Sequence, residues 1–390
     1  MSYRWIIAGG GTGGHVTPAL ALGEVIREAG EQVRFIGTRR GLETRLVPDS
    51  GFELLALDAR PIVGRGIFEQ IRAIFALLGA TFRAGLGLRE FAADLVISVG
   101  GYASVPTVLA ALLIRTPTVL VNTDATPGAA NRMHARFARR IFLGFEGTRE
   151  ALAPSAREER IRVVGVPLRK SLISEFRDTD AQVPRPESDG GPAEPPRREA
   201  GAAPIGPAHL FIFGGSQGAR QINDVMIEAL SKLDPVRIQI VHQTGDADRD
   251  RVEAAYAETD FQAEVIAFER DMPSRYRWAE LVLCRAGAIS VAELALAGRA
   301  SLLVPLAHVG GGEQFANARE LEKAGAARVL DSRALTADRL VEELEALLRD
   351  PSQLRRMGEN ASKLARPDAS ERIIEECRSL LGTESHGRRG

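Results

Sequence analysis

Short apolar runs alternate with amphipathic stretches along most of the chain. Runs rich in Ile, Val, Leu and Phe predict buried strands. The first half has five such runs, at residues 5–8, 32–36, 95–99, 118–121 and 140–143, and the second half has five more, at 210–213, 237–242, 263–268, 281–284 and 301–304. The stretches between them, such as 18–28 and 338–348, predict helices. This alternation favours parallel sheets with right-handed crossover connections.

Residues 178–207 interrupt the alternation. They are rich in Pro, Gly, Ala and charged residues and nearly lack large apolar side chains, which predicts a flexible linker or surface insertion. The 390 residues also exceed what one hydrophobic core usually serves. We therefore expect an N-terminal domain over 1–177 and a C-terminal domain over 208–390. For the last helix of the chain, packing on the N-terminal domain is an alternative to packing on the C-terminal domain.

The two halves resemble each other. WIIAGGGTGG at 5–14 and LFIFGGSQGA at 210–219 each contain a strand, a Gly-rich turn and the start of a helix. LVISVGGYASV at 95–105 aligns without gaps on LVLCRAGAISV at 281–291. The fold predicted from this repetition is α/β, with two Rossmann-like parallel-sheet domains that face each other across a cleft.

Composition excludes several classes of protein. With 45% hydrophobic and 26% charged residues, the chain has the make-up of an ordinary globular protein. Two cysteines, Cys284 and Cys377, are too few for a disulfide framework and suggest a reducing, cytosolic setting. We find no uncharged apolar run long enough to cross a membrane, and the N-terminus lacks the layout of a signal peptide.

Charge is distributed unevenly. Residues 1–175 carry 22 Lys and Arg against 16 Asp and Glu, whereas the remainder carries 28 against 35. A basic half suits an anionic lipid surface or a phosphorylated substrate, although variation between two domains would give the same numbers. Only 5% of residues are aromatic, and no basic patch is interleaved with aromatics, so nucleic acid is not an expected partner.

Gly-rich loops follow three of the predicted strands, at 9–15, 100–106 and 214–220. Glycines let the backbone approach a ligand closely, and a helix N-terminus behind them attracts a diphosphate. One such loop would be equally typical of a structural strand–helix turn, but its recurrence favours ligand binding. The acid that holds a dinucleotide ribose is absent after the second strand, where GTRR stands, and no Walker A lysine follows any loop.

Five motifs occur in an order that resembles the MurG family of bacterial peptidoglycan glycosyltransferases. They are GGGTGGH at 9–15, GGYASVP at 100–106, GGSQGAR at 214–220, CRAGAISVAELALAG at 284–298 and EQFANA at 313–318. The resemblance covers nearly the whole chain except 178–207 and implies the GT-B fold. It also implies inverting transfer of N-acetylglucosamine from UDP-N-acetylglucosamine to undecaprenyl-pyrophosphoryl-MurNAc-pentapeptide (lipid I), giving lipid II. Neither a metal nor a cofactor is expected.

By this resemblance the C-terminal domain holds the donor. Glu293 would accept hydrogen bonds from both ribose hydroxyls, a task that suits two carboxylate oxygens. The other implied donor contacts are Ala288, Ile289, Ser290, Val291 and Ala292 for uracil and phosphates, Ser216 and Arg169 for the phosphates, and Gln314 and Asn317 for the sugar. Simpler roles stay open: Glu293 as an exposed helix acid, Ser216 as a helix cap and Arg169 in a surface ion pair.

The N-terminal domain would hold the acceptor. Thr12, Gly13, Gly14 and His15 match the loop at the reaction centre, where His15 would act as a general base or orient the leaving phosphate. Capping or packing is the simpler role for a lone histidine. The other histidines have no ligand-like spacing, so we predict no metal site.

The chain departs from the family pattern at the predicted base. Where the family has His-Glu-Gln-Asn, residues 121–124 read Val-Asn-Thr-Asp, so Asn122 replaces the glutamate and Asp124 replaces the asparagine. An amide accepts no proton as a general base, which leaves Asp124 and His15 as candidates. Before Gln314, the usual acid and histidine are also replaced, by residues of the GGE sequence at 311–313.

Residues 66–88 combine apolar residues at helical spacing with arginines at 65, 72, 83 and 89. Such a face is able to dock on an anionic bilayer, as the family does at the cytoplasmic face of the inner membrane, or to pack in the core. Proteins of cell-wall synthesis are further expected partners. Three other functions stay open: a UDP-sugar epimerase on the same fold, a divergent paralogue that glycosylates another lipid acceptor, and a non-catalytic nucleotide-binding protein.

Overall fold

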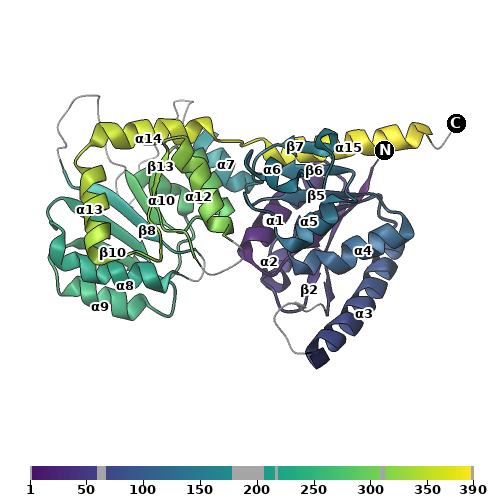
Figure 1. The fold of residues 1–390 in the computed structure, drawn as a ribbon, viewed down its shortest axis with the longest axis horizontal. Helices are drawn as coiled ribbons and strands as arrows, with labels where there is room; N and C mark the ends of the chain where they lie inside the picture. The colour runs from purple at the N-terminus through teal and green to yellow at the C-terminus, as the bar shows by residue number, and fades with distance from the viewer. Residues whose placement is uncertain (1, 59–66, 178–205, 216–217, 308–311, 388–390) are drawn as a thin grey trace. The chain divides into compact units, whose positions relative to one another are not determined.

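The computed structural model describes residues 2–58, 67–177, 206–215, 218–307 and 312–387 (Figure 1). The chain forms two compact units. Unit 1 contains Met1–Lys170 and Arg366–Gly390, and unit 2 contains Ser171–Ala365. Of the predicted linker 178–207, all but the last two residues lie outside the described residues.

Unit 1 is built on a parallel sheet of seven strands in the order β3-β2-β1-β4-β5-β6-β7. The strands are β1 (Arg4–Gly9), β2 (Gln32–Thr38), β3 (Leu54–Leu57), β4 (Leu95–Gly100), β5 (Thr118–Asn122), β6 (Arg140–Leu143) and β7 (Ile161–Val163). The order reverses between β1 and β4. In open parallel sheets, ligands bind at the carboxyl ends of the strands beside such a switch point.

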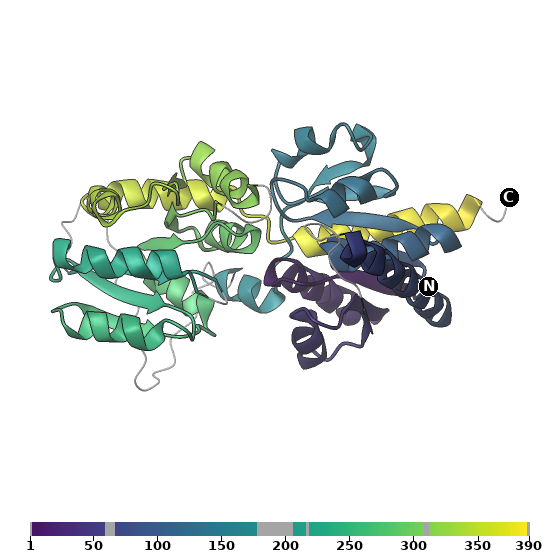
Figure 2. The ribbon, with the colours of Figure 1, turned by 60° about the horizontal axis from the view of Figure 1, so that its bottom comes forward.

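Helices cover both faces of this sheet (Figure 1). They are α1 (Gly13–Glu28), α2 (Glu43–Asp49), α3 (Ile67–Phe91), α4 (Val105–Ile114), α5 (Ala129–Ala135), α6 (Thr148–Leu152) and α15 (Ala369–Gly387). Successive strand residues point to opposite faces. Trp5 and Ile7 of β1 therefore pack in the core with α1 and α15, whereas Ile6 packs with α3 and α4. The C-terminal helix α15 lies against α1 (Figure 2).

Unit 2 is built on a second parallel sheet, of six strands in the order β10-β9-β8-β11-β12-β13. The strands are β8 (Ala208–Phe213), β9 (Ile238–Gln243), β10 (Gln262–Ile266), β11 (Leu281–Cys284), β12 (Ala300–Leu303) and β13 (Ala327–Val329). The helices are α7 (Lys170–Arg177), α8 (Arg220–Ala229), α9 (Arg249–Ala257), α10 (Met272–Trp278), α11 (Ala288–Ala297), α12 (Glu313–Lys323), α13 (Ala337–Leu348) and α14 (Pro351–Lys363). Here the order reverses between β8 and β11.

The predicted α/β class, with two Rossmann-like parallel sheets, is confirmed. Each of the ten predicted strands occurs. The structure adds three short strands, β3, β7 and β13, which lie at sheet edges. One prediction needs correction at its boundary: the helix predicted over 18–28 begins at Gly13, so Pro18 lies inside α1 rather than at its start.

Candidate active site

Three loops of unit 1 meet at the switch point of its sheet. Residues 10–12 follow β1, Gly101 follows β4 and residues 123–128 follow β5. Gly10, Gly11 and Gly101 have φ of 150°, 96° and 75°, which are backbone conformations that favour glycine. A Cβ atom on Gly101 would lie 2.9 Å from the carbonyl oxygen of Gly10 and 3.6 Å from Nδ1 of His15, so the loop after β4 packs tightly against the loop after β1, beside the His15 ring.

His15 lies in the first turn of α1 and is half-buried. Its Nδ1 lies 3.1 Å from Oγ1 of Thr12, the N-cap residue, and its backbone N–H donates to the Thr12 carbonyl. Burial lowers the pKa of His15 below its ordinary value, while the carboxylates of Asp124 and Glu43 act in the opposite direction. The imidazole is therefore neutral at neutral pH and able to accept a proton.

Asn122 and Asp124 play different parts here. Asn122 is 1% exposed, and its Oδ1 accepts a 2.7 Å hydrogen bond from Nδ2 of Asn131. Its own Nδ2 donates to the backbone carbonyl of Asp124 at 2.6 Å. The Asp124 carboxylate, in contrast, is close enough to raise the pKa of His15. The amide at 122 thus fixes the loop that presents Asp124 to His15.

Replacing Asn122 with alanine is therefore expected to destabilise unit 1 by about 1–3 kcal/mol, because the buried Asn131 amide loses its acceptor. The test is chemical denaturation of a Trp278→Phe background, in which Trp5 is the one tryptophan and reports on unit 1. Asn360→Ala, a partly exposed site in unit 2, serves as the control. Equal stability of the two variants would contradict a structural role for Asn122.

The equivalent edge of unit 2 contains the loop after β8. Gly215 and Gly218 have φ of 91° and 73°. A Cβ atom on Gly218 would lie 1.9 Å from the carbonyl oxygen of Thr244, so the loop packs too tightly against the end of β9 for any other residue. Nε2 of Gln243 donates to the Gly215 carbonyl at 3.1 Å. Ser216, the predicted diphosphate contact, lies outside the described residues.

Helix α11 begins beside that loop, directly after the strand on the other side of the switch point. The first backbone hydrogen bond at its N-terminus runs from Val291 to Gly287, which leaves the N–H groups of Ala288, Ile289 and Ser290 without a partner inside the helix. Such N–H groups suit a phosphate or a uracil carbonyl. Ala292 is the next residue on this helix and is half-buried.

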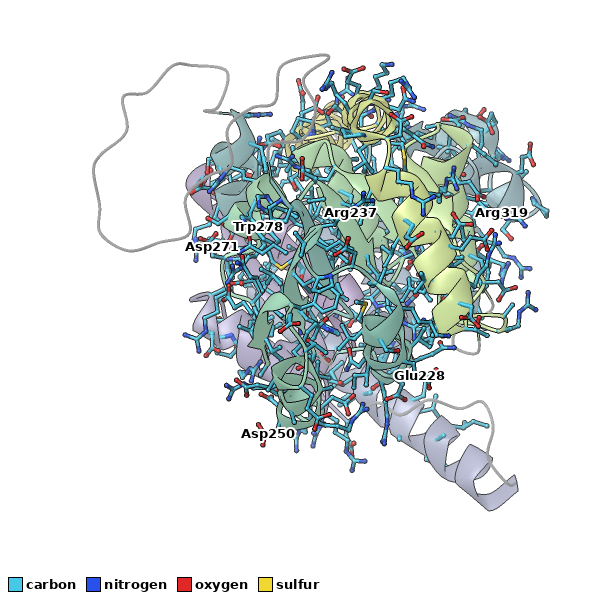
Figure 3. All side chains as sticks on the ribbon, turned by 90° about the vertical axis from the view of Figure 1, so that its left-hand side faces the viewer. Glu228, Arg237, Asp250, Asp271, Trp278 and Arg319 are labelled. Atoms are coloured by element: carbon cyan, nitrogen blue, oxygen red, sulfur yellow. The ribbon has the colours of Figure 1, made fainter. Side chains whose placement is uncertain are left out.

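Glu293 lies further along α11, and its Oε2 accepts a 2.8 Å hydrogen bond from the hydroxyl of Tyr276 on α10. Figure 3 labels both ends of α10: Asp271, the N-cap residue, and Trp278, which stacks on His209. Burial raises the pKa of Glu293 to about 7, although the hydrogen bond from Tyr276 lowers it. No sequence motif pointed to Tyr276, because its hydrogen bond to Glu293 joins two separate helices.

Three predicted donor contacts bind protein groups in this structure. Oε1 of Gln314 accepts from the backbone N–H of Leu306 at 2.9 Å, and Nδ2 of the fully buried Asn317 donates to the Ala286 carbonyl. Arg169 forms a 2.6 Å ion pair with Glu24 of α1, within unit 1. Gln314 thus supports the loop after β12, and Asn317 supports the loop before α11. Contact of these amides with a donor sugar stays a prediction, as does contact of Arg169 with phosphate.

Comparison with known proteins places these sites in a family. Residues 5–143 match the glycosyltransferase family 28 N-terminal domain, and residues 209–373 match its C-terminal domain. The solved structure of MurG from Acinetobacter baumannii is 28% identical, with a TM-score of 0.75 over 97% of this chain and 99% of that one. The UDP-N-acetylglucosamine–N-acetylmuramyl-(pentapeptide) pyrophosphoryl-undecaprenol N-acetylglucosamine transferase of Syntrophotalea carbinolica is 38% identical over 98% of this chain and 100% of its own length. The chain belongs to the MurG family.

Other enzymes share the fold of the MurG family at low sequence identity. The UDP-GlcNAc 2-epimerase of Neisseria meningitidis, solved with UDP-GlcNAc bound, is 14% identical with a TM-score of 0.63 and covers 97% of this chain and 100% of its own. Identity at this level shows the fold alone. Among the described residues, no group of three His, Cys, Asp or Glu side chains is placed to hold a metal ion.

Proposed function

We propose that this member of the MurG family transfers N-acetylglucosamine from UDP-N-acetylglucosamine to lipid I, with inversion at the anomeric carbon, to give lipid II and UDP. The observation that carries the proposal is the 38% identity to a named transferase over essentially the full length of both chains. The two switch-point sites, one in each unit, support it. The product would enter peptidoglycan synthesis and so serve cell shape and division.

In this proposal, unit 1 supplies the base. The acceptor hydroxyl oxygen attacks the anomeric carbon, the bond from that carbon to the UDP oxygen breaks, and the hydroxyl proton passes to His15. In the tautomer in which Nδ1–H donates to Oγ1 of Thr12, Nε2 is the nitrogen that accepts the proton. The Asp124 carboxylate stabilises the imidazolium that forms. Asn122 has no part in proton transfer, since its amide is committed to Asn131 and to the Asp124 backbone.

Unit 2 binds the donor. The N–H groups at the start of α11 and the Gly-rich loop after β8 would hold uracil and the diphosphate. The Glu293 carboxylate would accept hydrogen bonds from both ribose hydroxyls, while the Tyr276 hydroxyl donates a hydrogen bond to its Oε2. Gln314 and Asn317 would contact the sugar after exchanging their present backbone partners.

UDP release distinguishes transfer from epimerisation. Purified protein receives UDP-N-acetylglucosamine with and without a short-chain lipid I analogue, and released UDP is followed by a coupled assay. The proposed function predicts release only with the acceptor. Release without acceptor would favour an epimerase or a hydrolase. Release with other lipid-linked acceptors but not with lipid I would favour a divergent paralogue.

We also propose peripheral attachment to the cytoplasmic face of the inner membrane. Five large apolar side chains on one face of α3, here called the α3 patch, are exposed: Ile74, Phe75, Leu78, Phe82 and Leu86. The opposite face packs in the core through Ala80, Ala84 and Leu88. Arg83 and Arg89 are exposed beside the patch, which suits anionic lipid. In the described part of the chain, no helix is both long and apolar enough for a transmembrane span.

Replacing Phe75 and Phe82 with serine is expected to weaken binding to vesicles of phosphatidylglycerol and phosphatidylethanolamine by at least about tenfold, because two apolar side chains no longer enter the bilayer surface. Vesicle co-sedimentation measures the effect. Phe268→Ser, at an exposed phenylalanine of unit 2, is the matched control. Undiminished vesicle binding by the double variant would contradict membrane attachment through the α3 patch.

A further inference from the structure

Glu43, the first residue of α2, is a buried acid that the proposed mechanism does not use. It is 1% exposed. Its Oε2 accepts a 2.7 Å hydrogen bond from the backbone N–H of Gly11, in the loop that precedes His15. Its Oε1 accepts from the backbone N–H and the hydroxyl of Thr38, at 2.8 and 2.7 Å. The carboxylate thus links the Gly-rich loop after β1 to the end of β2.

Three glycines from separate segments make room for this side chain. A Cβ atom on Gly10, Gly37 or Gly41 would lie 2.3, 2.7 or 2.0 Å from an atom of Glu43. Real Cβ atoms do not approach so closely, so a side chain at any of these positions would displace the side chain of Glu43. The backbone around Glu43 is therefore shaped to receive a carboxylate at this one place.

The charge of Glu43 acts on His15. Among the described residues, no lysine or arginine forms an ion pair with Glu43, so its negative charge is balanced by hydrogen-bond donors alone. Two carboxylates influence the histidine, Asp124 from the loop after β5 and Glu43 from α2, and both raise the pKa of His15 against the effect of burial.

We propose that Glu43 is a positioning residue for His15: its carboxylate fixes the loop at Gly11, and so places Thr12 and His15, and its charge stabilises the protonated imidazole. The catalytic part of this inference rests on the proposed function. The structural part does not, because the contacts lie wholly within unit 1. Glu43 itself would touch neither donor nor acceptor.

Glu43→Gln is the main test, since it keeps the shape of the side chain and removes the charge. The new amide group must face an N–H donor at Gly11 or at Thr38, so one contact is lost. We expect kcat for transfer to fall by about 10- to 100-fold, as for a misplaced catalytic group. KM for UDP-N-acetylglucosamine should stay within about twofold, because that site lies in unit 2. Glu53→Gln, at an exposed ion pair with Arg34, is the matched control.

NMR titration of the His15 ring gives a readout independent of transfer. The His15 signal is assigned as the one missing from His15→Gln. In Glu43→Gln this signal should titrate at lower pH than in the wild type, because a negative charge near the imidazolium has gone. Glu43→Asp retains the charge but shortens the side chain, so it should lower kcat with less effect on the His15 titration. If Glu43→Gln does not fold, Glu43→Asp provides the test of positioning.

The outcomes separate the two proposals. An unchanged His15 titration together with an unchanged kcat in Glu43→Gln would overturn the role of Glu43. If the wild type transfers no sugar to lipid I, the proposed function fails, but the titration still decides whether Glu43 controls His15.

Discussion

His15→Ala is expected to lower kcat for transfer to lipid I by about 10²- to 10⁴-fold, the usual contribution of a general base. The reason is geometric: His15 is a titratable side chain at the switch point of unit 1, Thr12 engages its Nδ1, and the carboxylate of Asp124 acts on its charge. KM for UDP-N-acetylglucosamine should change little, because the proposed donor site lies in unit 2. Steady-state kinetics with a short-chain lipid I analogue measure both constants.

The pH profile adds a second check on the same residue. Burial lowers the pKa of His15, so the neutral base is present at neutral pH and kcat should fall only as the pH drops through this lowered pKa. Asp124→Asn removes a charge that raises the pKa of His15, and the acid limb should therefore move to lower pH. Asp94→Asn, on a loop away from these carboxyl ends, is a suitable control. Near-normal kcat in His15→Ala would exclude this histidine as the base.

Glu293→Ala is expected to weaken binding of UDP-N-acetylglucosamine by about 10- to 100-fold. The ribose hydroxyls would form weaker hydrogen bonds with the water that replaces the side chain than with an ionised carboxylate. Calorimetry without acceptor measures the dissociation constant. Removing the ribose 2′-hydroxyl from the donor should weaken binding to the wild type but hardly affect the variant. Glu322→Ala, at an exposed acid of α12, is the control.

The affinity of the wild type should also depend on pH. Burial raises the pKa of Glu293 to about 7, so the carboxylate becomes protonated, and loses acceptor strength, as the pH falls below that value. Binding should weaken over the same range, and Glu293→Gln should abolish this dependence. The diphosphate diester of the donor does not titrate there. Equal affinity of the wild type and Glu293→Ala for UDP-N-acetylglucosamine at pH 8 would contradict a contact between Glu293 and the ribose.

The pattern of apolar runs predicted ten of the strands, because most of them are largely buried segments between turn residues. This pattern did not predict the edge strand Ile161–Val163, because three residues are too few to show a period. The predicted start of α1 at residue 18 was too late because proline, which has no backbone N–H, is typical of the first turn of a helix. In the structure the helix begins before Pro18, at Gly13.

The candidate site was predictable only where it follows motifs. Thr12, His15 and Glu293 lie in recognisable segments, but the environment of Asn122 depends on Asn131, nine residues away on another element. The surroundings of the Glu43 side chain come from the loop after β1, the end of β2 and the loop before α2, and no sequence motif marks this combination. Residues 66–88 left two alternatives open, a membrane face or a core face. The structure shows an exposed apolar face and a core face on opposite sides of α3.

Following the labelled sugar tests inverting transfer to lipid I directly. Purified protein is given UDP-N-acetylglucosamine labelled in the sugar and a short-chain lipid I analogue, and the lipid product is isolated and examined by NMR. We expect one labelled N-acetylglucosamine per acceptor, joined through a β linkage, and much slower formation of this product by His15→Ala. Label that stays in the nucleotide fraction or leaves as free sugar, or an α-linked product, would contradict inverting transfer to lipid I.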